Sequence, residues 1–338
     1  MNQKRIGKQT VALRDPPVII GSASAVGRKE GEGPLGKSFD VVSEDSYFGE
    51  KTWEKAESAM QRLAFRGALN KARLLPSQLD YLFAGDLLNQ CIASTFGMRD
   101  TAVPYYGLFG ACSTMAEGLG LAAMMIDGGY AGYACALTSS HFCSAERQFR
   151  QPLEYGGQRS PTAQWTATAA GAAVLAGSGD GPRVTHVTTG RIRDAGISDV
   201  NNMGAAMAQA AYDTLRCHLD DLSLAPTDYD LIVTGDLGRI GRGIVLDFFR
   251  RDGIDLAPVY DDCGVLLYDQ GRQDVHAGGS GCGCSAAVLC SWIMEGIRGG
   301  RWRRVLFCGT GALMSPTSSG QGESIPGICH AVAIAGGQ

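Results

Sequence analysis

Residues 110–113, Gly-Ala-Cys-Ser, place a cysteine where a strand is predicted to turn into a helix. Residues 105–109 are aromatic and apolar, as in a buried strand, and residues 113–126 have the small, apolar composition of a buried helix. Cys112 is therefore expected at a helix N-terminus, where unpaired backbone N–H groups and the helix dipole stabilise a thiolate or a bound anion. Both covalent chemistry and carboxylate binding could use such a site.

Polar side chains follow two other predicted strands. Asp86 and Asn89 come directly after the apolar residues 82–84, and His141 ends the strand that runs into Thr138-Ser-Ser. Asp86 could accept hydrogen bonds that shape its turn, or it could contribute an oxygen to bound calcium. We expect His141 to line a pocket; a loop histidine held by its own hydrogen bonds is the alternative.

Three arginines, Arg147, Arg150 and Arg159, follow the strand that ends at His141. A guanidinium can pair with a ligand carboxylate through two parallel hydrogen bonds. We expect at least one of these arginines, Arg147 first, to do so. The others are expected in a solvated loop or in pairs within the chain.

Composition excludes several classes of function. The 338 residues are 45% hydrophobic and carry 30 basic against 34 acidic side chains, a net charge of -4, which gives no electrostatic basis for binding nucleic acid or anionic lipid. The eleven cysteines are scattered and odd in number, as expected of reduced, intracellular thiols. No signal-peptide core follows Met1, and no apolar run approaches the roughly 18 residues of a membrane span.

Two motif matches lack the context that their chemistry needs. Residues 31–38, GEGPLGKS, satisfy the P-loop pattern, but no buried strand runs directly into them, so we do not expect nucleotide binding. Cys282 and Cys284 form C-x-C without a second thiol pair, which does not make a zinc-ligand set. We predict no intrinsic metal site.

The elements that must position these residues repeat along the chain. Residues 76–87, PSQLDYLFAGDL, match residues 226–237, PTDYDLIVTGDL, and each follows an Ala- and Met-rich helical pattern. A second match pairs Ala-Cys-Ser at 111–113 with Gly-Cys-Ser at 283–285. We predict two duplicated α/β halves about a pseudo-twofold axis, 1–178 and 179–338, with a cleft where they meet. The residues expected to face that cleft are Asp86, Cys112, Gly235, Asp236 and Ser280.

This arrangement resembles the thiolase-like superfamily, which includes the condensing enzymes of fatty-acid synthesis and has a layered αβαβα fold. Within it, the sequence is most similar to the stage V sporulation protein AD family. The stretches that carry this resemblance are FAGDLLNQ (83–90), LFGACSTMAEGL (108–119), TSSHFCSAERQFRQPLEYGGQ (138–158), HAGGSGCGCSA (276–286) and ESIPGICHAV (323–332). The resemblance implies a role in the uptake of dipicolinic acid, pyridine-2,6-dicarboxylate, into the developing spore.

The chain departs from the condensing enzymes at two positions that their chemistry needs. In the alignment Gly235 replaces the family's histidine and Ser280 its asparagine. Each lost donor typically costs about 10² to 10³ in rate, so we expect no enzyme, and Cys112 as a vestigial nucleophile. Cys308 loosely resembles the thiolase base, but it is expected to end a buried strand.

We therefore predict a non-catalytic binding protein for dipicolinate, carried as its calcium chelate. Calcium would neutralise the two carboxylates, so that the pocket would not need several buried cations. Apart from calcium brought by the ligand, no cofactor is expected. The expected ligand-binding residues are Asp86, Asn89, Phe109, Cys112, Ser113, His141, Arg147 and Ser280.

Two other functions stay open at this point. One is an acyltransferase or thioesterase that keeps Cys112 as nucleophile and uses His141 as base. The other is a scaffold that holds a membrane transport assembly together. The family resemblance implies membrane subunits of that assembly as partners, and through them a peripheral location at the spore inner membrane. Thiolase-like proteins are commonly dimers, and a homodimer is the oligomeric state to test.

Overall fold

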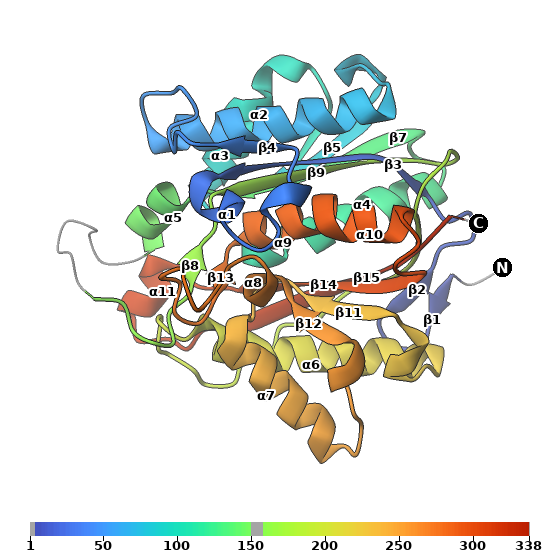
Figure 1. Ribbon diagram of the computed structural model, residues 1–338. Coiled ribbons are helices and arrows are strands. Elements are labelled where there is room, and N and C mark those ends of the chain that lie inside the picture. The colour runs from blue at the N-terminus through green and yellow to red at the C-terminus, as the bar shows by residue number, and fades with distance from the viewer. Residues whose placement is uncertain (1–3, 150–157, 338) are drawn as a thin grey trace.

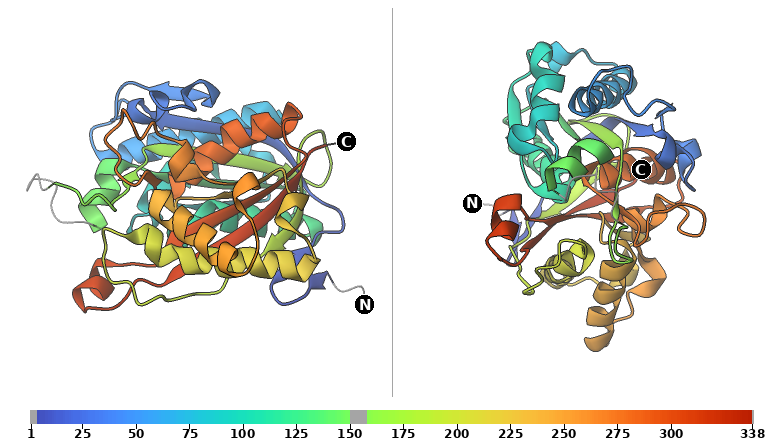
Figure 2. Two further views of the ribbon diagram at one scale, coloured as in Figure 1. Left: turned by 60° about the horizontal axis from the view of Figure 1, so that its bottom comes forward. Right: turned by 90° about the vertical axis from the view of Figure 1, so that its left-hand side faces the viewer.

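The computed structural model describes residues 4–149 and 158–337 as five stacked layers (Figure 1). Helix α2 covers the outer face of one set of strands, α4 and α9 lie between two sets, and α6 and α7 cover the outer face of the second set. The left view of Figure 2 shows α6 lying along β14 and β15, and α7 packs beside α6. This layering confirms the predicted αβαβα class.

The first half of the sheet is ordered β3-β9-β7-β5-β6, with β4 beside β3. The strands β5, β6 and β7 run parallel, whereas β9 is antiparallel to both β7 and β3. The bounds are β3 Val18–Gly27, β4 Val41–Ser43, β5 Tyr81–Gly85, β6 Tyr105–Leu108, β7 Tyr133–Ser140 and β9 Ala169–Ala176.

The second half repeats this order as β10-β15-β14-β11-β12. Its parallel and antiparallel pairings correspond one by one to those of the first half. The two halves join through β3 and β10, and β1 and β2 extend the sheet beside β10. The bounds are β1 Arg5–Ile6, β2 Thr10–Ala12, β10 Arg183–Thr188, β11 Leu231–Thr234, β12 Tyr260–Asp262, β14 Arg304–Ala312 and β15 Gly327–Ala335.

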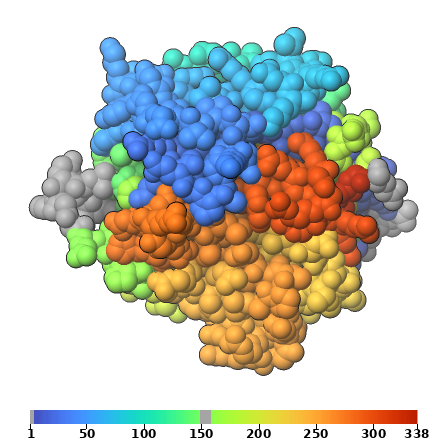
Figure 3. All heavy atoms as spheres, viewed as in Figure 1, coloured from blue at the N-terminus to red at the C-terminus, as the bar shows by residue number. Residues whose placement is uncertain are grey.

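The helices follow the same duplication, because α2 and α6 precede the equivalent strands β5 and β11. The predicted boundary at residue 178 falls in the connection between β9 and β10 and stays a prediction. Figure 3 shows the N-terminal elements (blue) above and the yellow and orange residues around α6 and α7 below. The helix bounds are α1 Arg28–Gly31, α2 Trp53–Ala72, α3 Ile92–Met98, α4 Thr114–Asp127, α5 Phe142–Phe149, α6 Met203–Leu222, α7 Gly238–Arg251, α8 Cys263–Leu266, α9 Cys282–Val288, α10 Met294–Arg298 and α11 Pro316–Gly320, with a π-helical turn at Leu289–Ile293.

One prediction about the strands is wrong. Residues 105–109 were expected to be a buried strand, but β6 is the last strand of its sheet and its side chains are largely exposed. Tyr106 is 50% exposed and Phe109 56% exposed. Aromatic composition favours a strand at either position, and only the strand order puts this one at the edge.

Glycines allow the central helix α9 to lie directly on the sheet. A Cβ added at Gly171 of β9 would stand 2.4 Å from the carbonyl oxygen of Ala286, and one added at Gly283 of α9 would stand 2.1 Å from the carbonyl oxygen of Ala169. Both contacts are with backbone, which cannot rotate away as a side chain can. Only glycine, which has no Cβ, therefore fits at these two positions between α9 and β9.

We expect Gly171→Ala to lower the free energy of unfolding by about 1 to 3 kcal/mol, since an added methyl group overpacks a contact between backbones. Urea unfolding measures this difference. Gly243→Ala is the matched control: a Cβ at that helical glycine of α7 meets nothing within 4 Å, and the change should stabilise by up to about 1 kcal/mol. Equal stability of wild type and Gly171→Ala would show that α9 can shift away from β9.

Candidate functional site

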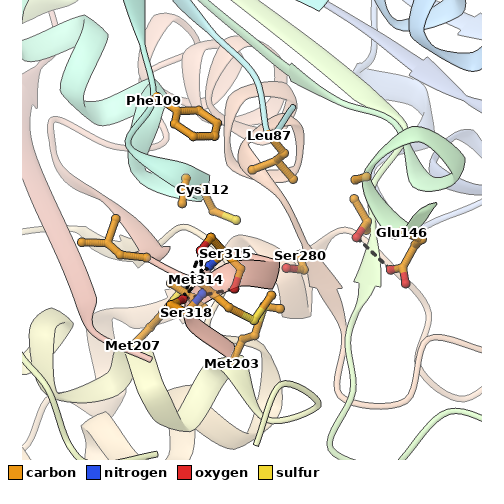
Figure 4. Close-up of a pocket in the computed structure, with 15 residues that line it drawn as sticks. Leu87, Phe109, Cys112, Glu146, Met203, Met207, Ser280, Met314, Ser315 and Ser318 are labelled. Carbon is orange, nitrogen blue, oxygen red and sulfur yellow. Dashed lines mark hydrogen bonds between the residues drawn. The ribbon is translucent and has the colours of Figure 1, made fainter. Parts of the chain in front are cut away.

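A cavity of about 380 Å³ lies where the two halves meet (Figure 4). Its walls come from the segment after β6, from α5 and α6, and from the segment that follows β14. Most of the lining is apolar and rich in methionine. The residues that line it are Leu87, Phe109, Ala111, Cys112, Ala145, Glu146, Thr166, Met203, Met207, Ser280, Ala312, Leu313, Met314, Ser315 and Ser318.

Cys112 lies on a sharp turn between β6 and α4, as predicted, within a single 3₁₀ turn (Ala111–Ser113). Ala111 has φ of 51°, a left-handed conformation that is uncommon for residues with a side chain. Ser113 holds the turn from inside, because its hydroxyl donates to the carbonyl oxygen of Gly110 at 2.7 Å. Ser113 is buried and does not line the cavity, so its place is beneath the site and not in it.

The thiol of Cys112 is held in its neutral form. Burial raises the pKa of Cys112 well above its ordinary value, and the nearby carboxyl of Asp236 raises it further. Both effects oppose the thiolate that a helix N-terminus was expected to stabilise. Cys112 is therefore a poor nucleophile at neutral pH.

Asp236 is fully buried behind Cys112 and Ser280. Its carboxyl accepts hydrogen bonds from the Thr310 hydroxyl at 2.8 Å, the Gly281 N–H at 2.9 Å and the Ser280 hydroxyl at 3.2 Å. The sequence placed Asp236 at the cleft, through its repeated Gly-Asp-Leu, but did not include it among the ligand-binding residues. Burial raises the pKa of this carboxyl, while its hydrogen bonds act in the opposite direction.

Asp86, the equivalent of Asp236 in the first half, shapes a turn. It is fully buried and accepts hydrogen bonds from the Leu88 N–H at 2.9 Å and from the N–H and hydroxyl of Ser94 at 2.8 Å and 2.6 Å. This is the first of the two roles that the sequence allowed. Asp86 does not line the cavity of Cys112.

The structure does not bring the remaining predicted ligand residues to this cavity. His141 lines another one, where its Nε2 lies 2.8 Å from the carbonyl oxygen of Ser46 and its Nδ1 accepts from the Cys143 N–H at 3.2 Å. Burial lowers the pKa of His141, so it is a neutral ring that fixes a loop. Asn89 and Arg147 line a third cavity.

Two of the three predicted arginines are described, and Arg150 lies outside the described residues. Arg147 forms an ion pair with Glu54 and lies over the ring of Trp53. Arg159 lies over the ring of Trp165, away from Cys112. Of the predicted ligand-binding residues, Phe109, Cys112 and Ser280 therefore share the cavity.

No sequence pattern predicted the three methionines that line the cavity. Met203 and Met207 lie one turn apart on α6, and Met314 follows β14 (Figure 4). Their side chains meet only because α6 packs on β14 and β15. In the described residues no group of three or more His, Cys, Asp or Glu side chains is placed to hold a metal ion.

A second network of buried carboxyls lies beside the site. Glu57 accepts hydrogen bonds from the hydroxyls of Ser139 at 2.8 Å and Ser144 at 2.7 Å. Burial, with Asp86 nearby, raises the pKa of Glu57 from 4.5 to about 8. At neutral pH this side chain therefore carries a proton.

Comparisons with known proteins agree with this architecture. Residues 7–335 match the sequence profile of stage V sporulation protein AD. Stage V sporulation protein AD of Bacillus subtilis (strain 168) is 44% identical over 329 residues, which cover 97% of each chain.

Two solved structures show the same fold. A 3-oxoacyl-[acyl-carrier-protein] synthase III from Aquifex aeolicus superposes with a TM-score of 0.56 at 14% identity, covering 94% of this chain and 99% of that one. An OleA variant from Xanthomonas campestris with cerulenin superposes with a TM-score of 0.61 at 16% identity, covering 99% of each. At such identities these structures support the fold alone.

We expect Glu57→Gln to weaken the pH dependence of stability. Because the folded pKa is raised, the native state binds more protons than the unfolded state between about pH 4.5 and 8, so Glu57 lowers stability by up to about 1.4 kcal/mol per pH unit as pH rises. Urea unfolding from pH 5 to 9 measures the slope in both proteins. Glu295→Gln, on the exposed face of α10, should leave the slope unchanged. If the free energy of unfolding changed with pH equally in wild type and Glu57→Gln, Glu57 would not have a raised pKa in the folded protein.

Proposed function

The chain belongs to the stage V sporulation protein AD family, and from that premise we propose that it is a non-catalytic binding protein for dipicolinic acid in the uptake of this acid into the developing spore. The observation that carries the proposal is the cavity at Cys112. Its apolar walls suit the faces of a planar aromatic ring, and Cys112 and Ser280 supply polar contacts at one end.

Three features of the site argue against condensation chemistry. The Cys112 thiol is neutral at physiological pH because burial and Asp236 raise its pKa. Gly235 and Ser280 stand at the aligned positions of the condensing enzymes' histidine and asparagine, and the buried carboxyl of Asp236 behind Ser280 opposes a developing oxyanion. His141, the base of the acyl-transfer alternative, lines a different cavity.

The calcium chelate fits the charge of the cavity better than the free dianion. Among the described residues that line it there is no lysine or arginine, and the carboxyl of Asp236 lies directly behind Ser280. Buried like charges repel strongly where water is excluded. In the chelate the two carboxylates and the calcium ion cancel.

Isothermal titration calorimetry tests this proposal. We expect saturable heat with calcium dipicolinate, an affinity about 2- to 10-fold weaker in Cys112→Ala, and no binding in Ala312→Trp, whose indole would fill the cavity. Tyr130→Ala, a residue 72% exposed beyond the far end of α4, is the matched control and should bind as wild type does.

Phthalate and an acyl-CoA serve as control ligands in the same titration. Heat from acyl-CoA alone, together with a mass increase on Cys112 that turns over, would favour the acyl-transfer alternative, which the apolar walls could accommodate. No heat from any of these compounds would favour the scaffold.

We also propose that membrane subunits of the same sporulation transport assembly are partners, and that they place the protein at the spore inner membrane. In the part of the chain that the structure describes, no helix has both the length and the apolar character to cross a bilayer. Attachment through such subunits is therefore the proposed route to that membrane.

A homodimer is the oligomeric state that we propose, through β6. Among the described strands β6 pairs only with β5, so its other edge presents unpaired backbone groups. The exposed rings of Tyr106 and Phe109 add apolar surface to that edge, and Tyr106 stacks on Phe83 with ring centroids 5.2 Å apart. A second copy can pair its own β6 antiparallel across a twofold axis.

We expect Tyr106→Glu to shift the protein to a monomer of 35.6 kDa in light scattering after size exclusion. Each copy would bring a glutamate to the paired edge, and the like charges should weaken association more than about 100-fold. Tyr130→Glu places the same charge away from β6 and should leave the dimer intact. A wild-type protein that is monomeric at high concentration would rule out the β6 interface.

A further inference from the structure

Asp236 lies one layer behind the wall that a ligand would touch. The Ser280 hydroxyl, which lines the cavity, donates to its carboxyl, and the Cys112 thiol lies close enough for each group to shift the pKa of the other. An anionic group that contacts Cys112 and Ser280 therefore comes near a buried carboxyl.

The groups that face Asp236 supply hydrogen bonds but no positive charge. Thr310 of β14 and the Gly281 N–H donate to its carboxyl, and the Gln164 amide donates to its backbone carbonyl. The titratable groups that neighbouring elements place around it are Cys112, Cys282, Cys284, Cys263 and Asp262. Among the described residues no lysine or arginine is buried.

We propose that Asp236 takes up one proton when free dipicolinate binds, and that the calcium chelate binds without this proton. The inference rests on the proposed function and makes Asp236 the residue that sets which charge state of the ligand the cavity accepts. The proton comes from solvent and attaches to a carboxylate oxygen, with no other bond made or broken. An incoming dianion thus meets a neutral acid.

The hydrogen bonds around Asp236 can accommodate the protonated form. Oδ1 still accepts from the Thr310 hydroxyl, and a proton on Oδ2 can be donated to the hydroxyl oxygen of Ser280, which then turns its own hydrogen elsewhere. The Gly281 N–H keeps its place beside Oδ2. Burial already raises the pKa of Asp236 in the free protein. A bound anion would raise this pKa further.

Calorimetry at several pH values, each in two buffers of different ionisation enthalpy, measures proton uptake directly. Over pH 6 to 9 both carboxylates of the free acid are ionised. For free dipicolinate we expect uptake to rise towards one proton with increasing pH, while the affinity falls by up to about tenfold per pH unit. For calcium dipicolinate we expect no uptake and a flat affinity.

Two variants test whether Asp236 is the group that takes up the proton. Asp236→Asn should bind free dipicolinate with no proton uptake and no pH dependence. Glu30→Gln is the matched control, because Glu30 is also fully buried with a raised pKa but lies beside another cavity, held by Tyr268 and the Thr168 N–H. It should keep the wild-type uptake.

Several results would overturn the inference while leaving the proposed function in place. These are binding of free dipicolinate without proton uptake, equal uptake with the chelate, uptake kept in Asp236→Asn, or uptake lost in Glu30→Gln. A complete lack of heat from both ligand forms would instead remove the proposed function. The comparison of the two ligand forms uses the wild-type protein alone, and it decides the case even if Asp236→Asn does not fold.

Discussion

Asp236, two residues after β11, accepts hydrogen bonds from Thr310 on β14, from Ser280 and from Gly281, the residue that precedes α9. Two segments that are distant in sequence are thus fixed to one carboxyl group of a third, and one of the two includes Ser280, which lines the cavity. A buried carboxyl that lost these donors would be strongly destabilising. This arrangement fixes the position of Ser280, and the nearby carboxyl adds to the effect of burial in raising the pKa of Cys112.

The same constraint operates throughout the interior. Among the described residues six carboxyl groups are buried, whereas no lysine or arginine is. Hydroxyls and backbone N–H groups donate to Asp236 and Asp262, and burial raises the pKa of Asp262 to about 7. The described lining of the cavity has no lysine or arginine for an anionic ligand. Our proposals therefore balance the ligand's charge with calcium carried by the ligand or with a proton on Asp236.

The duplication supplies two equivalent strand ends that have become different sites. Asp86 and Asp236 occupy the same place in Gly-Asp-Leu, after β5 and β11. In the first half Leu88 and Ser94 donate hydrogen bonds to the carboxyl of Asp86, which does not line the cavity. In the second half Ser280 donates to the carboxyl of Asp236 and also lines the cavity. Of these two equivalent strand ends, only the one in the second half is therefore connected by a hydrogen bond to a residue that lines the cavity at Cys112.

The sequence by itself determined the fold class, the repeat and the turn at Cys112, because repeated motifs and the composition of strands and helices are local properties. Only the tertiary structure decided which strand ends share a cavity: Asn89, His141 and Arg147 follow strands as predicted, yet they line other cavities. It also decided that β6 is an exposed edge and that α6 supplies a methionine wall. These features depend on strand order and helix packing, which join residues far apart in the chain and leave no local pattern.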